Sequence, residues 1–134
     1  MTPPPSARLV GISLDCPDPQ RLADFYRDLL GGRELWAKES SVGVEVPGMV
    51  LVAQLVEDHV APRWPGSSIV HLDLTAEDLD AAQGRALALG AALPDQPDPR
   101  WRVLLDPAGH PFCLTPFTPE TTPRKPPEVE QADE

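Results

Sequence analysis

The chain has 134 residues, 41% of them hydrophobic, which suits a single domain built around one core. Its formal net charge of −10 argues against nucleic acid or an anionic membrane surface as the partner. No apolar run approaches the roughly 20 residues that span a bilayer and no signal peptide is evident, so we expect a cytoplasmic protein with Cys16 and Cys113 as reduced thiols.

Proline is unusually frequent and concentrates at the two ends of the chain. These ends hold little apolar material that could offset the entropy lost on ordering. We therefore predict a flexible tail at residues 1–6 and a disordered acidic, proline-rich tail at residues 119–134. One folded domain is expected between them, at residues 7–118.

The first half of the folded part contains a strand, a helix and three further strands. Alternating apolar residues predict the first strand over 8–16. Asp18 is placed to cap a helix with an apolar stripe from Leu22 to Leu30, and Gly31 ends that helix. The three strands that follow are expected at residues 33–39, 41–46 and 49–56.

The second half repeats this order of elements. A strand is predicted over 69–75, and Asp78 is placed to cap a helix that ends at Gly90. Three strands are expected after the helix, a short one near 91–93 and longer ones at 100–106 and 111–117.

This internal repeat predicts two modules, at about 7–57 and 68–118. Aligning Gly11 with His71 places Asp18 on Asp78, 60 residues further along the chain. A module of this size would be marginal alone, so we expect the two to share one continuous sheet.

Alternation also assigns side chains to the faces of the second module's strands. His71, Asp73 and Thr75 share one face of its first strand, and Cys113 and Thr115 share one face of its last strand. We favour a ligand pocket lined by these residues. The alternative is a partly solvated sheet face on which these polar side chains only hydrogen-bond to one another. His71, with Asp73 beside it, is a candidate general base.

The tryptophans offer aromatic surface for a flat ligand or a dimer interface. Trp36 and Trp101 occupy comparable strands of the two modules, which places both among the expected ligand contacts. Trp64 lies in the linker between Arg63 and Pro65, where packing into a core is least expected.

Three stretches carry a family resemblance: LDCPDPQRLADFYRDLLGG at 14–32, VHLDLTAEDLDAAQGRALALGA at 70–91 and LLDPAGHPFCL at 104–114. In order and spacing they are similar to the vicinal oxygen chelate superfamily, which includes glyoxalase I, extradiol dioxygenases, fosfomycin resistance enzymes and bleomycin resistance proteins. The resemblance implies an α+β fold in which two βαβββ modules form a curved mixed sheet around a cavity. It also implies a homodimer.

Metal-using members of that superfamily have ligands at four positions, which here hold Gly11, Gln54, His71 and Cys113. Glycine has no side chain with which to coordinate, whereas zinc takes about four N, S or O donors. We therefore expect no bound metal. If a divalent metal does bind, the ligands that the resemblance implies are His71, Gln54 and Cys113.

The leading hypothesis is a glyoxalase-like protein with a degenerate metal site that binds or sequesters an aromatic or cationic small molecule. The alternative is a metal-assisted lyase, isomerase or dioxygenase in which His71 is a ligand or a base. A third hypothesis is that formation of the dimer is itself the function of the protein. The residues expected at the ligand site are His71, Asp73, Cys113, Thr115, Gln54, Trp36 and Trp101.

Overall fold

A computed structural model of the chain describes residues 9–66, 70–95 and 102–116. The two predicted tails and Trp101 lie outside these ranges, so the domain limits drawn from the sequence stay predictions. No helix within the described ranges is long and apolar enough to cross a membrane.

The first module consists of β1 (Gly11–Cys16), α1 (Pro19–Leu30), β2 (Arg33–Ala37), β3 (Ser41–Val46) and β4 (Met49–Leu55). Its strands form one mixed sheet in the order β1-β4-β3-β2, with β1 parallel to β4 and the other neighbours antiparallel. The Asp18 carboxylate caps α1 by accepting a bond from the backbone N–H of Arg21 at 3.2 Å. Gly31 ends the helix with a φ of 71°, a conformation that glycine adopts without strain.

The second module consists of β5 (Leu72–Thr75), α2 (Leu79–Ala88), β6 (Arg102–Leu105) and β7 (Pro111–Thr115). Its sheet has the order β5-β7-β6, and β5 is parallel to β7 as β1 is to β4. The short strand expected near 91–93 is reduced to a bridge between Ala92 and Leu105. The prediction of an α+β fold with two modules of one topology is confirmed.

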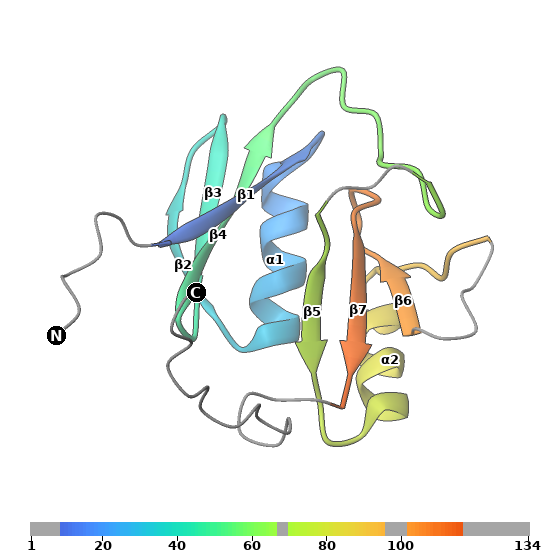
Figure 1. Ribbon diagram of the computed structural model, residues 1–134. Coiled ribbons are helices and arrows are strands. Elements are labelled where there is room, and N and C mark those ends of the chain that lie inside the picture. The colour runs from blue at the N-terminus through green and yellow to red at the C-terminus, as the bar shows by residue number, and fades with distance from the viewer. Residues whose placement is uncertain (1–8, 67–69, 96–101, 117–134) are drawn as a thin grey trace, which may run out of the picture.

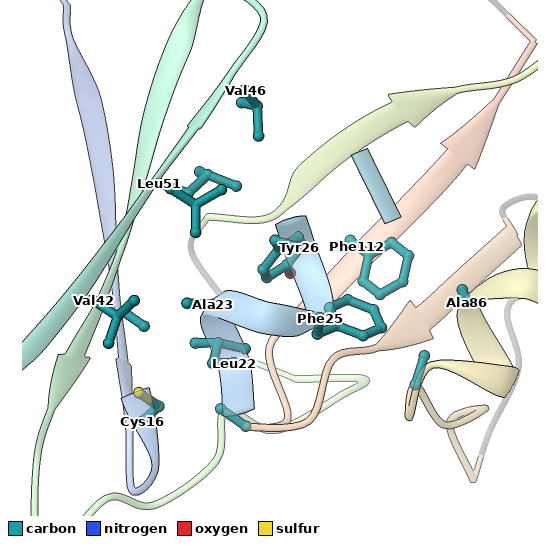
Figure 2. Close-up of a cluster of buried hydrophobic side chains, with 14 of the residues drawn as sticks. Cys16, Leu22, Ala23, Phe25, Tyr26, Val42, Val46, Leu51, Ala86 and Phe112 are labelled. Atoms are coloured by element: carbon teal, nitrogen blue, oxygen red, sulfur yellow. The ribbon is translucent and has the colours of Figure 1, made fainter. Parts of the chain in front are cut away.

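Helix α1 lies between the two sheets (Figure 1). On one side its Leu22 and Ala23 belong to the buried cluster with the apolar residues of β3 and β4 (Figure 2). On the other side the Phe25 ring lies 5.9 Å from the ring of Phe112 in β7, measured between centroids. Because one helix buries both sides, the described strands form two separate sheets and not the single continuous sheet expected from the sequence.

Each sheet therefore has an apolar face on the helices and a second face that points away from them. In β4, Leu51 and Ala53 are buried in the core, which puts Gln54 on the outward face. In β7, Phe112 and Leu114 are buried in the core, which puts Cys113 on the outward face. Because α1 lies between the two sheets, both outward faces point away from that helix (Figure 1).

Candidate functional site

The outward face of the second sheet gathers most of the polar residues that the sequence predicted for a ligand site. Cys113 pairs in register with Asp73, and Thr115 pairs with Thr75, because β5 and β7 are parallel neighbours. His71 directly precedes β5 and lies on the same face as Asp73. We call this surface the triad face; it carries His71, Asp73, Thr75, Cys113 and Thr115.

Three side chains on the triad face converge on one point. The Nδ1 atom of His71 lies 3.1 Å from Oδ1 of Asp73 and 3.9 Å from Sγ of Cys113. All three ligating atoms lie within 4.8 Å of one another. The distances show that these residue types, named from the sequence, are brought together by strand pairing.

The three residues differ in burial. Cys113 is 8% exposed, whereas the side chains of His71 and Asp73 are 38% and 62% exposed. A molecule arriving from solvent therefore meets the imidazole and the carboxylate first and the sulfur beneath them.

This arrangement does not suit a thiol nucleophile activated by a histidine relay. In such a relay one ring nitrogen faces the nucleophile and the other ring nitrogen faces the carboxylate. Here the same atom, Nδ1 of His71, faces both Cys113 and Asp73. Convergence of N, O and S donors is instead the pattern of a ligand or metal contact.

The linker contributes an aromatic ring to the triad face, which the sequence did not place there. The rings of Trp64 and His71 meet edge to face, with centroids 6.5 Å apart and an interplanar angle of 82°. The linker is held by His59, whose Nε2 lies 2.9 Å from the carbonyl oxygen of Ala108. The indole N–H of Trp64 is buried with no hydrogen-bond partner among the described residues, so the ring offers mainly its aromatic surface. In the sequence, only the neighbouring Arg63 and Pro65 indicated that Trp64 lies outside the core.

Gln54 and Trp36 lie on the outward face of the first sheet, away from His71. The amide nitrogen of Gln54 donates to the carbonyl oxygen of Ser40 at 3.4 Å. The indole N–H of Trp36 donates to Oγ of Ser41 at 3.0 Å, and its ring covers Gly43 so closely that a side chain there would collide with it. One chain therefore does not bring Gln54 or Trp36 to the three converging side chains.

Gly11 could not easily be replaced by a metal ligand. A Cβ atom added at this position would lie 2.9 Å from the carbonyl oxygen of Val50, because β1 and β4 are paired there. Real Cβ contacts are longer, so any side chain would require the backbone to shift. The structure thus gives a physical reason for the glycine at this position.

The second cysteine has no part in the triad face. Cys16 ends β1 on the apolar side of the first sheet and is fully buried. Burial raises the pKa of its thiol to about 11, so the sulfur stays protonated and weakly reactive at neutral pH. Cys16 is thus part of the buried core.

Comparison with known proteins gives a consistent family and fold. Residues 11–115 match the model of a family described as a glyoxalase-like domain. No curated protein matches the chain.

Several solved structures share the fold at low sequence identity. Fosfomycin resistance protein FosX from Listeria monocytogenes is 20% identical over 85% of this chain and 94% of that chain, with a TM-score of 0.64. A FosX variant from the same organism, solved with Mn(II) and 1S,2S-dihydroxypropylphosphonic acid, is 19% identical over 86% of this chain and 96% of that chain, with a TM-score of 0.65. A glyoxalase/bleomycin resistance protein/dioxygenase family enzyme from Burkholderia phytofirmans is 18% identical over 81% of this chain and 97% of that chain, with a TM-score of 0.63.

Proposed function

The chain belongs to the glyoxalase-like family, and from this premise we propose that it binds a small molecule on the triad face. The observation that carries the proposal is the convergence of His71, Asp73 and Cys113 within 4.8 Å on an outward surface of the second sheet. Binding sites for small molecules combine a few convergent polar groups with apolar or aromatic walls. Trp64 supplies such a wall beside His71.

The groups present favour an aromatic or cationic ligand. The Trp64 ring can contact a flat aromatic group or the face of a cation. Asp73 presents a carboxylate that is 62% exposed, and the chain as a whole is strongly acidic. Both features attract positive charge and repel anions.

Calorimetric titration of a panel of cationic aromatic compounds into the full chain tests this proposal. We expect at least one compound to bind with a micromolar or lower Kd. His71→Ala and Asp73→Asn should each weaken that binding by about tenfold or more, since each removes a polar contact. Asp80→Asn changes an exposed carboxylate on α2 and serves as the matched control. Equal binding by His71→Ala and the wild type would contradict the proposal.

A second candidate function is a metal-assisted lyase, isomerase or dioxygenase reaction at the same face. It is favoured by the donor set, because His71, Asp73 and Cys113 offer one N, one O and one S atom within 4.8 Å. When bound, a divalent metal would supply Lewis-acid polarisation of a substrate oxygen. In that case His71, Asp73 and Cys113 would hold the metal, and Trp64 would orient the substrate.

Mass spectrometry of the compound after incubation separates binding from chemistry. We expect a compound that is only bound or sequestered to be recovered unchanged. Conversion by the wild type that is lost in His71→Ala, but not in Asp80→Asn, would favour the reaction instead. The two candidate functions thus share a site and differ in the fate of the ligand.

We also propose a homodimer in which the outward face of the first sheet of one copy covers the triad face of the other. Gln54 and Trp36 lie on the first sheet, His71 directly precedes β5 of the second, and α1 lies between the two sheets (Figure 1). A second copy in this arrangement would join these residues in one site. Closed two-fold dimers are the commonest oligomers of soluble proteins.

Sedimentation equilibrium and a mixing experiment test the dimer. We expect a mass of twice the 14.5 kDa of one chain. His71→Ala and Trp36→Ala should each weaken ligand binding, yet an equal mixture that is allowed to exchange subunits should regain wild-type affinity at roughly a quarter of the sites. The regained sites combine His71 of one copy with Trp36 of the other. If each site were formed within one chain, mixing would restore nothing.

The proposal includes a cytoplasmic location. It is supported by Cys16 and Cys113, which lie on different sheets and form no disulfide with each other.

A further inference from the structure

We infer that the triad face holds one thiophilic divalent ion, such as Zn²⁺, through Nδ1 of His71, Oδ1 of Asp73 and Sγ of Cys113. The inference deepens the proposed function, and rests on it only for the role of the ion in binding the small molecule. The site lies within the second sheet of a single copy. It needs neither Gly11 nor Gln54, two of the four positions that the family resemblance implies.

The spacing of the donor atoms suits zinc. Bonds of about 2.0–2.3 Å in a tetrahedral site place neighbouring donors roughly 3.3–3.8 Å apart. The distances from Nδ1 of His71 are 3.1 Å to Asp73 and 3.9 Å to Cys113, and all three donor atoms lie within 4.8 Å of one another, so the set is close to this spacing and wider at its edge. Closing the set around one ion requires the side chains to rotate toward one another.

The fold holds these donors in place. Asp73 and Cys113 are paired in register on parallel strands, so their side chains leave the same face of the sheet side by side. His71 lies two residues before Asp73 and points to the same side. The positions therefore depend on the pairing of β5 with β7, the central strand of the second sheet.

The donor types select among metals. A thiolate and an imidazole favour zinc over the hard ions Mg²⁺ and Mn²⁺, which prefer oxygen ligands. Three protein donors leave a fourth tetrahedral position open, as in catalytic zinc sites. That open position faces the exposed side of the triad, where the proposed small molecule would bind.

Metal titration of the full chain, stripped with a chelator, tests the inference directly. We expect one Zn²⁺ per chain, bound at least about a hundredfold more tightly than Mn²⁺. Co²⁺ in place of zinc should give a thiolate-to-metal charge-transfer band and the strong visible bands of tetrahedral coordination. Circular dichroism confirms that each variant is folded before titration.

Matched variants identify the ligands. Cys113→Ser should abolish the charge-transfer band, and His71→Ala and Asp73→Asn should each weaken Zn²⁺ binding by at least about tenfold. Cys16→Ala and Asp80→Asn should leave it unchanged. The inference is overturned if zinc does not bind below the millimolar range, if Cys113→Ser binds it as the wild type does, or if Gln54→Ala abolishes binding.

The small molecule is then titrated with and without Zn²⁺, which separates this inference from the proposed function. Zinc that binds through the three residues, with no compound bound at the face, would support the metal site and contradict the proposed function. If a compound binds at the triad face but the protein does not bind zinc, the proposed function is supported and the metal site is contradicted.

Discussion

Asp106→Ala is expected to lower the free energy of unfolding by about 3–5 kcal/mol, because one buried carboxylate satisfies three donors at once. Asp106 is 3% exposed. Its Oδ2 accepts a bond from the hydroxyl of Tyr26 in α1 at 2.7 Å, and its Oδ1 accepts from the backbone N–H groups of Ala108 and His110 at 2.9 Å each. Alanine would leave the Tyr26 hydroxyl buried and unpaired and would remove the acceptor of two backbone N–H groups in the turn before β7. Urea unfolding measures the loss.

Asp106→Asn is the informative companion to this variant. The amide oxygen can still accept from the turn, and the amide nitrogen can donate to the Tyr26 oxygen. We expect a loss of roughly 1–2 kcal/mol, clearly less than that of Asp106→Ala. Equal losses in the two variants would mean that the carboxylate with its two acceptor oxygens is required, because Asn keeps the volume of the side chain but has only one acceptor oxygen.

The wild type and Asp106→Asn should also differ in how their stability depends on pH. Burial raises the pKa of Asp106 in the folded protein, although its hydrogen bonds with Tyr26 and with the turn oppose the shift. A carboxyl whose folded pKa lies above its unfolded pKa contributes stability below the unfolded pKa and loses that contribution as pH rises through the folded pKa. The stability of the wild type relative to Asp106→Asn should therefore fall as pH increases from about 4 to 7. A difference that stays constant across this range would contradict the shift.

Much of the fold could be predicted because its signals are local. Asp18 and Asp78 precede apolar stripes, and both cap helices as expected. Alternation along 71–75 and 111–115 correctly placed His71, Asp73 and Cys113 on one face, because the side-chain period of a strand is two regardless of its neighbours.

Other features depend on contacts between distant segments, which local patterns do not encode. The apolar stripe of α1 predicts that the helix is buried. It does not predict that Phe25 and Leu22 pack on different sheets. That packing separates Gln54 from His71, so that Asp73 and not Gln54 lies beside His71 and Cys113. Trp64 could not be placed because the path of a linker depends on where it is anchored, here by His59 on the turn before β7.

The aromatic contact between the modules yields the second large effect. Phe112 is fully buried in β7, beside Cys113, and its ring packs on Phe25 at 5.9 Å and on Tyr26 at 6.4 Å. Phe112→Ala should lower the free energy of unfolding by about 3–5 kcal/mol, because it removes a large side chain and leaves a cavity between α1 and the second sheet. Urea unfolding measures this change. Phe112→Leu refills most of the space and should cost less, roughly 1–2 kcal/mol.

Zinc binding by Phe112→Leu then shows which contacts hold the donors. The pairing of β5 with β7 places Asp73 beside Cys113, and Phe112 points to the other face of the sheet, toward α1. We therefore expect the folded variant to bind Zn²⁺ within about twofold of the wild type although its stability is lower. If zinc affinity fell together with stability, docking of α1 would be part of what holds the site, and the second sheet alone would not be sufficient to form it.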